Sequence, residues 1–185
     1  MTPAKMHDGC RTMESPSLAA VRKAMASGSS EVLAVLSGLR AIAGALPGPP
    51  VSVEDISARI GFRVIPLAGM EDAFSGIVSM RDALIGVNAR HSYYRQRFTI
   101  AHELGHILLG HPPECRCTAE EVRMFNRRAD QCAAEMLMPE EFLMPLLSGD
   151  ASPLRLARQF EVSESAMKRR LSYLRGIGVL PPSVL

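Results

Sequence analysis

Between residues 31 and 46, apolar residues recur every three or four positions, which is the spacing of one face of an α-helix. The Pro- and Gly-rich run 47–50 ends this pattern, so we expect a packing helix that stops there. Ser52 then suits a helix N-cap and Gly61 a C-terminal stop, which predicts a short helix between them. Residues 1–30 have no sustained period and are expected to form a flexible arm.

Three short segments that follow Gly61 are rich in β-branched and apolar residues, which is typical of strands. They cover residues 63–67, 74–80 and 83–88. Arg81-Asp82 suits a turn between the last two segments, so we expect a small antiparallel sheet. An exposed edge of such a sheet can pair with an extended peptide.

Helical spacing returns at Phe98 and continues to about Leu109, and this segment contains His102-Glu103-x-x-His106. Residues four apart lie on one face of a helix, so both imidazoles can bind the same metal ion. Glu103 then lies beside the coordination position that stays open to water. This motif is that of zinc hydrolases. We therefore expect Zn²⁺ as the cofactor, His102 and His106 as ligands, and Glu103 as the general base.

A catalytic zinc site usually has three protein ligands, so a further ligand must come from elsewhere in the chain. Gly110 ends the metal helix, and a short loop follows. Thr118 and Glu121 have the spacing of a capping box, which predicts a second long helix that ends before Pro139. Residues 140–147 predict one further short helical piece. The second long helix is therefore the place to look for the third ligand.

The two long helices together resemble those of the ImmA/IrrE family of metallopeptidases. The first carries Arg97-Phe98-Thr99 ahead of its His-Glu-Leu-Gly-His motif, and the second carries Ala129-Asp130, Ala133-Ala134 and Leu137-Met138-Pro139. The similarity runs from about residue 51 to residue 180. It implies an α+β fold in which a small antiparallel sheet packs on a zincin-like pair of helices, and it implies metallopeptidase activity.

The resemblance also locates the third ligand position. In the wider glutamate-zincin pattern, the ligand Glu lies twenty residues after the second histidine, and an Asp follows four residues later. Counting from His106 reaches Asn126 and then Asp130. Where a carboxylate is expected, this chain has an amide, whose neutral carbonyl oxygen is a weaker zinc donor. The expected ligands are thus His102, His106 and Asn126, and catalytic competence depends on this amide.

Other residues leave the third ligand open. Asp130 is expected to accept the free imidazole N–H of a ligating histidine and so fix its tautomer, and it is also the alternative direct ligand. Glu120, Glu121 and Glu135 are further candidates, although Glu135 is expected to face solvent. His111 has the wrong spacing for a zincin ligand and is expected to interact with the last carbonyls of the metal helix.

Residues 151–185 have the pattern of two capped helices separated by a turn at Glu161-Val162-Ser163, which is typical of a helix-turn-helix. Six Lys and Arg residues stand against two Glu residues here, so the net charge of +4 permits phosphate contacts. Relatives in the resembled family carry a similar Leu-Ala-x-x-Phe-x-Val-Ser segment. We therefore expect a packing or substrate-docking module and do not favour DNA as its partner.

The composition, 47% hydrophobic and 22% charged over 185 residues, suits one core plus a small appendage. We expect a flexible arm at 1–30, a zincin-like metallopeptidase domain at 31–150 and a helix-turn-helix-like segment at 151–185.

The net charge of +2 gives no general argument for nucleic acid, and no apolar run is long enough to span a bilayer. Four cysteines without a secretory signal are expected to stay reduced in the cytoplasm.

Two functions fit these observations. The first is a zinc-dependent endopeptidase that cleaves a helix-turn-helix repressor, as members of the resembled family do in stress or mobile-element switches. The second is a catalytically weakened regulator that keeps the peptidase scaffold and binds a repressor or DNA. Asn126 is the best support for the second function.

Overall fold

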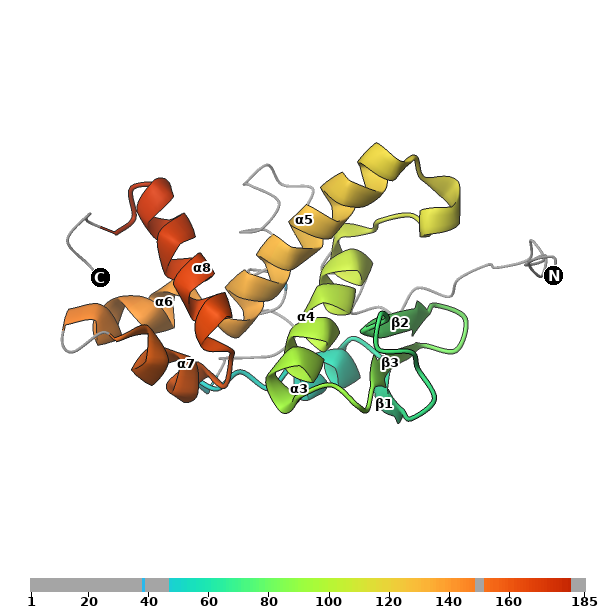
Figure 1. The fold of residues 1–185 in the computed structure, drawn as a ribbon, viewed down its shortest axis with the longest axis horizontal. Coiled ribbons are helices and arrows are strands. Elements are labelled where there is room, and N and C mark those ends of the chain that lie inside the picture. Colours follow the sequence, from blue (N-terminus) through green and yellow to red (C-terminus); the bar gives the residue numbers. More distant parts are fainter. Residues whose placement is uncertain (1–37, 39–46, 149–151, 181–185) are drawn as a thin grey trace.

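The computed structural model of the protein describes residue 38, residues 47–148 and residues 152–180. These parts form helices around a three-stranded sheet, which confirms the α+β class (Figure 1). The elements are, in chain order, α3 (Val53–Arg59), β1 (Arg63–Leu67), β2 (Gly76–Ser79), β3 (Leu84–Asn88), α4 (Tyr93–Leu109), η1 (Glu114–Arg116), α5 (Ala119–Leu137), α6 (Glu140–Leu143), η2 (Met144–Ser148), α7 (Pro153–Phe160) and α8 (Glu164–Gly176). The arm expected at 1–30 lies outside the described residues. So does the helix expected at 31–46, except for Gly38.

Local signals in the sequence set three helix ends as predicted, although α4 begins at Tyr93, five residues before the expected Phe98. The Ser52 hydroxyl accepts a hydrogen bond from the Asp55 backbone N–H at the start of α3, 3.1 Å away. Gly110 ends α4 in the left-handed region with φ at 65°. Thr118 and Glu121 form both hydrogen bonds of a capping box at the start of α5.

The sheet is mixed, so the expectation of a wholly antiparallel sheet is wrong for one of its two pairings. β2 pairs with β3 antiparallel, but β1 pairs with β3 parallel, and the strand order is β1-β3-β2. The chain reverses between β1 and β2 and again at the turn before β3. Two reversals make β3 run parallel to β1, and β3 enters between the two earlier strands. Strand composition does not reveal which neighbour a strand takes.

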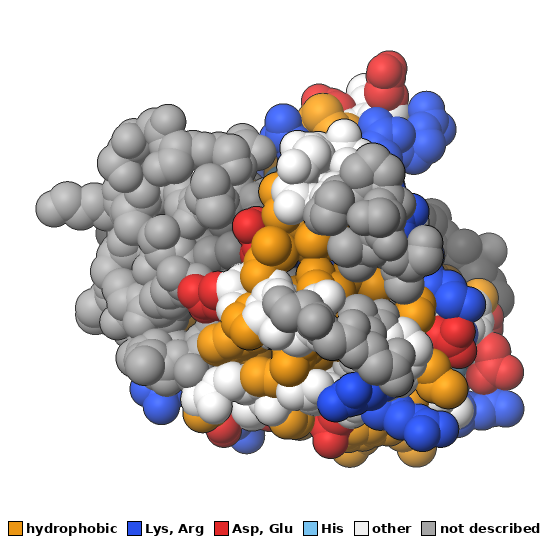
Figure 2. Space-filling view, turned by 90° about the vertical axis from the view of Figure 1, so that its left-hand side faces the viewer, with side chains coloured by type: hydrophobic (Ala, Val, Ile, Leu, Met, Phe, Trp, Pro, Cys, Tyr) orange, Lys and Arg blue, Asp and Glu red, His pale blue; other side chains and the backbone are white. Residues whose placement is uncertain are grey.

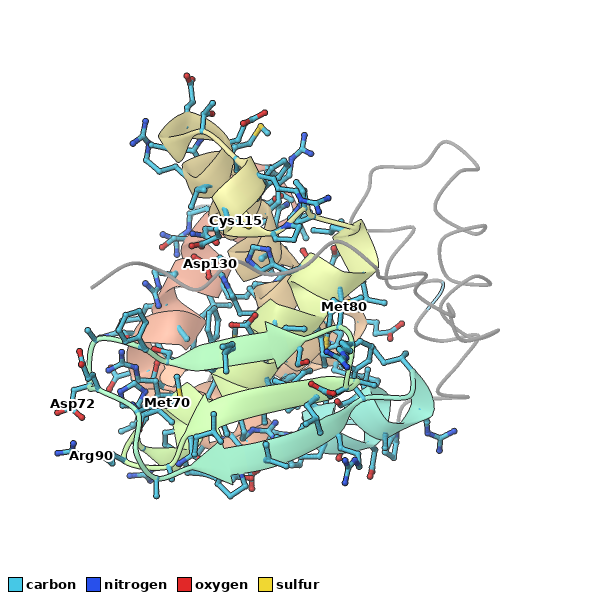
Figure 3. The ribbon with its side chains drawn as sticks, turned by 90° about the vertical axis from the view of Figure 1, so that its right-hand side faces the viewer. Met70, Asp72, Met80, Arg90, Cys115 and Asp130 are labelled. Carbon is cyan, nitrogen blue, oxygen red and sulfur yellow. The ribbon has the colours of Figure 1, made fainter. Side chains whose placement is uncertain are left out.

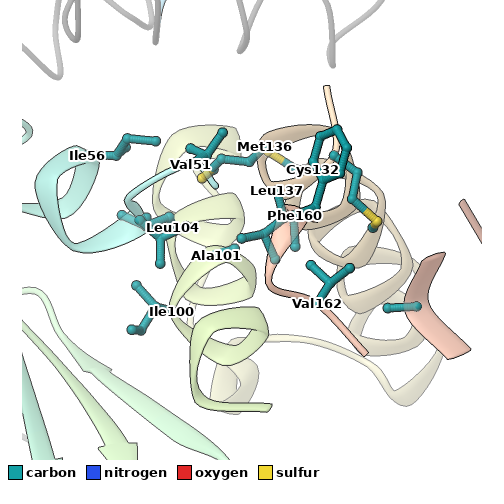
Figure 4. Close-up of a cluster of buried hydrophobic side chains, with 14 of the residues drawn as sticks. Val51, Ile56, Ile100, Ala101, Leu104, Cys132, Met136, Leu137, Phe160 and Val162 are labelled. Atoms are coloured by element: carbon teal, nitrogen blue, oxygen red, sulfur yellow. The ribbon is translucent and has the colours of Figure 1, made fainter. Parts of the chain in front are cut away.

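Helices α4 and α5 lie side by side in the centre of the molecule, with the sheet beyond α4 on one side (Figure 1). Gly105 allows their close approach, because a Cβ atom there would lie 3.0 Å from the Ala129 carbonyl oxygen and 3.1 Å from its Cα. The same core contains Leu104 of α4, Met136 of α5 and Phe160 of α7 (Figure 4). The C-terminal helices therefore share the core of the metal-motif helices.

Two buried arginines strengthen this packing. The Arg97 guanidinium on α4 donates hydrogen bonds to the carbonyl oxygens of Val51, at 2.8 Å, and of Glu161, at 3.2 Å. On α8, Arg170 forms a two-point ion pair with Glu135 of α5 and donates to a backbone carbonyl at the end of that helix.

The expectation that Glu135 faces solvent is therefore wrong. Its exposed fraction is 9%, and that of Arg170 is 2%. The partner lies 35 positions further along the chain, so helical spacing within α5 could not reveal it.

The end of the molecule formed by the C-terminal helices has a mixed surface. In Figure 2, hydrophobic side chains occupy the middle of this face, while Lys and Arg side chains lie around its margin with acidic side chains among them. Within the described ranges, no helix has both the length and the apolar character needed to cross a membrane.

Candidate metal centre

His102 and His106 lie one turn apart on the same face of α4, and their rings converge. Their Nε2 atoms are 3.1 Å apart, and the ring centroids are 4.8 Å apart. Two imidazole nitrogens bound to one tetrahedral zinc ion at about 2.0–2.1 Å would be separated by roughly 3.3 Å. The two nitrogens therefore already have nearly the spacing of ligands to a common ion.

Asp130 contacts the other nitrogen of the His102 ring. Its Oδ1 atom lies 2.8 Å from His102 Nδ1. A carboxylate at this distance accepts the Nδ1–H and fixes the tautomer whose Nε2 lone pair is free. The structure thus places Asp130 where the orienting role requires it, on the ring nitrogen opposite the one that faces His106.

His111 contacts His106 in a similar way, which the sequence interpretation missed. The backbone N–H of His111 does donate to the carbonyl of His106 at the helix end, at 3.0 Å. Its ring, however, lies with Nδ1 at 3.1 Å from His106 Nδ1 and packs on Phe125 with ring centroids 4.5 Å apart. The left-handed Gly110 reverses the chain and brings His111 over the preceding turn. That glycine was the only sequence signal for the contact.

These contacts are compatible with a set of tautomers suited to metal binding. If His106 donates its Nδ1–H to His111, the His106 Nε2 lone pair points toward His102, and His111 carries its own proton on Nε2. That His111 Nε2 atom is buried and has no hydrogen-bond partner in the part of the chain described. Two Nε2 lone pairs then face each other, an arrangement that a shared cation stabilises.

The electrostatic environment keeps the His106 ring neutral. Its pKa is lowered to about 4, mainly by burial and also by the neighbouring His102, while the Asn126 side chain and Asp130 act in the opposite direction. Burial likewise lowers the pKa of His111 to about 4. A neutral imidazole is the form that binds a metal ion.

Glu103 lies on the sheet side of the histidine pair. Burial raises the pKa of its carboxyl, His102 opposes that rise, and Glu114 of η1 adds to it. Strand β2 passes directly over this carboxylate, because a Cβ atom at Gly76 would lie 3.2 Å from Glu103 Oε1. Figure 3 shows Asp130 and Cys115, which belongs to η1, beyond the edge of the sheet that β2 forms.

Residues 58–172 match the model of a peptidase family, Peptidase_M78, described as the IrrE N-terminal-like domain. This match covers more than half of the chain. The protein belongs to the IrrE N-terminal-like family. No curated protein matches the chain.

Among solved structures, a Mycobacterium tuberculosis transcriptional regulator is similar, with a TM-score of 0.60 and 14% sequence identity. The alignment covers 91% of this chain and 53% of that regulator, so the protein spans about half of the regulator's length. At this identity the similarity concerns the fold alone.

Membership of the IrrE N-terminal-like family supports a protease-type hydrolase and a metallopeptidase-like function, and the family is typically metal-dependent. The two histidines of this member fit a divalent metal ion, because their free lone pairs converge and their opposite nitrogens have partners. Among residues 47–148 and 152–180, however, no group of three or more His, Cys, Asp and Glu side chains is arranged to hold a metal.

The structure places the other candidate third ligands in different surroundings. Asn126 lies near the histidine pair, because its side chain acts to raise the pKa of the His106 ring. Glu121 is engaged by Thr118 in the capping box, and those hydrogen bonds lower the pKa of its carboxyl. Glu120 is exposed in the first turn of α5, and Glu135 is paired with Arg170. Of these residues, the structure brings only Asn126 and Asp130 to the histidine pair.

Proposed function

We propose that the protein is a zinc-dependent endopeptidase that hydrolyses a peptide bond in a helix-turn-helix repressor. The observation that carries this proposal is the convergence of His102 and His106 at 3.1 Å with Glu103 beside them. His102, His106 and the Asn126 carbonyl oxygen would hold the zinc ion. Zinc bound there supplies Lewis acidity and lowers the pKa of a water molecule to about 7.

Glu103 is the proposed general base. Its partial burial raises the pKa of the carboxyl and so brings it closer to the pH at which a carboxylate both accepts and returns a proton efficiently. It takes a proton from the attacking water and passes it to the departing amine. Asp130 and His111 act through the two histidines, because each contacts the ring nitrogen that faces away from the histidine pair.

The edge of the sheet supplies a surface for the substrate backbone. Among the described residues, β2 pairs with β3 alone, so no described strand pairs with the backbone groups on its other edge. Gly76 at the start of β2 lies against Glu103, and Ile77 beside it is 57% exposed. A substrate segment in extended conformation would add to this edge as a further strand and pass next to the general base.

The repressor substrate is supported by the resemblance to ImmA/IrrE peptidases that act on repressors. A similar fold in a protein named as a transcriptional regulator is compatible with a regulatory role. Cleavage of a repressor would switch on its target genes, as in a stress response.

The test compares the wild type with Glu103→Gln. Both proteins should retain zinc, and only the wild type should cut a helix-turn-helix repressor encoded near its gene. Because the substitution removes the base and keeps the shape of the side chain, cleavage that persists in Glu103→Gln would overturn the mechanism.

A second candidate function, a regulator that binds a repressor or DNA without cleaving it, is favoured by Asn126. The amide at this position is a weaker zinc donor than a carboxylate. Zinc content of the wild type and of Asn126→Glu, measured side by side, separates the two candidates. Low content that the glutamate restores indicates a weakened site, whereas one zinc per chain in both proteins supports the enzyme.

A further inference from the structure

A continuous groove runs between the metal-motif helices and the C-terminal helices. One part is a pocket of about 420 Å³ between α4, α5 and α8, and the other is a pocket of about 320 Å³ between the start of α4 and the turn before α8. Phe98, Ala166 and Arg169 line both pockets, so the two pockets adjoin and together form a groove. We call it the α5–α8 groove.

Three arginines give this groove a positive charge. Arg127 and Arg169 line the larger pocket, and Arg95 and Arg169 line the smaller one. All three side chains are exposed. Within the described residues, no carboxylate pairs with Arg127 or Arg169, and Arg95 donates to the Ser75 hydroxyl at 3.0 Å.

The groove also has two other charged lining residues, Arg170 and Asp130. Arg170 is paired with Glu135, whereas the carboxylate of Asp130 keeps one negative charge, because the neutral His102 ring gives it a hydrogen bond but no charge. Among the described lining residues, the three exposed arginines outnumber this carboxylate. The net charge of the groove is therefore positive, which makes the groove complementary to an acidic ligand.

The shape and the apolar lining favour a polypeptide over nucleic acid. Phe98, Ala134 and Met138 line the larger pocket between the arginines, which suits side chains as well as charge. A helix-turn-helix normally inserts an exposed face of its second helix into the major groove of DNA. Here the Tyr173 face of α8 is turned toward α5, and the Tyr173 hydroxyl accepts a hydrogen bond from Gln131 at 2.6 Å.

The groove also reaches the metal centre. Asp130 lines the larger pocket and contacts His102 through its carboxylate. A polypeptide held in the groove therefore lies next to helices α4 and α5, which carry the histidine pair and Asp130. The β2 edge lies on the other side of α4, where the sheet is.

We propose that the α5–α8 groove binds an acidic segment of the protein substrate away from the bond that is cleaved. The identification of this ligand as the substrate rests on the proposed function. The C-terminal helices then select the substrate by charge, since Arg169 comes from α8 and Arg127 from α5.

The test measures binding separately from cleavage by using the full chain with Glu103→Gln. The probe is a fluorescein-labelled twelve-residue peptide that alternates Glu with Leu and Phe, and fluorescence anisotropy reports its binding. We expect Arg127→Gln with Arg169→Gln to weaken binding about tenfold, because two charge-assisted contacts are lost. A control protein with Arg63→Gln and Arg81→Gln has the same net charge, with one change at the start of β1 and the other in the turn between β2 and β3, and should bind like its parent.

Three outcomes would overturn the proposal. The first is that the groove variant and the control variant bind the acidic peptide equally well. The second is that a peptide with Gln in place of every Glu binds as tightly as the acidic peptide. The third is that a labelled DNA duplex binds more tightly than the acidic peptide and that its binding depends on the two arginines. A circular dichroism melt of each variant establishes that the two exposed arginines were replaced without unfolding.

The outcome for the proposed function is read from a separate experiment. If the acidic peptide binds through Arg127 and Arg169 but the wild type cuts no repressor, the groove stands as a binding site and the peptidase proposal fails. If the wild type cuts a repressor, the groove variant should raise the KM for that repressor and keep its zinc content. An unchanged KM would show that the groove does not bind the substrate.

Discussion

The carboxylate of Asp130 and the ring of His102 meet at 2.8 Å across the α4–α5 interface, on the nitrogen that faces away from His106. This contact joins the two helices at the centre of the candidate site. It also leaves the Nε2 atom of His102 as the free nitrogen.

Replacement of Asp130 should therefore weaken metal binding. We expect Asp130→Ala to lower zinc affinity about 10–100-fold, because His102 loses the acceptor that fixes its tautomer and orientation. Competition with a chromophoric chelator measures this affinity. Asp72→Ala, the same substitution at an exposed position in the loop before β2, is the matched control and should bind zinc like the wild type. A fall of the same size in both variants would remove the orienting role.

His111 should act on His106 in the same manner. We expect His111→Phe to lower zinc affinity about tenfold, because the ring remains packed on Phe125 but no longer accepts a hydrogen bond from His106. His111→Asn keeps a polar side chain at this position and should lose less affinity. Chelator competition again measures the zinc affinity of each variant. Equal zinc affinity in His111→Phe and the wild type would show that the contact is only packing.

The sequence predicted those parts of the site that depend on nearby residues. His102, Glu103 and His106 are placed by the helical period, and the capping residues Thr118 and Glu121 act within one turn. Such relations need only the geometry of a single helix.

The parts that were wrong or missed depend on partners from other elements. Glu135 is buried because Arg170 arrives from α8, and the ring of His111 reaches His106 because the chain reverses at Gly110. The parallel pairing of β1 with β3 likewise follows from the path of the chain between strands. None of these contacts leaves a periodic trace in the sequence.

The ion pair between Glu135 and Arg170 should carry much of the attachment of α8. Glu135→Ala leaves the Arg170 charge buried and without its carboxylate, so we expect the free energy of unfolding to fall by about 3–5 kcal/mol. The double variant Glu135→Leu with Arg170→Met removes both charges and should be destabilised less than Glu135→Leu or Arg170→Met alone. Urea unfolding measures all of these values. A double variant as unstable as the sum of the single variants would contradict coupling between the two residues.

Gly76 should be required for the fit of β2 over the general base. A Cβ atom at this position would lie 2.4 Å from Thr99 Cγ2 and 3.2 Å from Glu103 Oε1, so Gly76→Ala must displace the strand or the carboxylate. We expect a loss of about 1–3 kcal/mol in the free energy of unfolding, together with slower cleavage of the substrate. The control Gly69→Ala meets nothing within 4 Å and should leave both quantities unchanged. Thr99→Ser removes the nearer obstacle, so adding it to Gly76→Ala should restore stability, and a failure to do so would place the cause of the loss elsewhere.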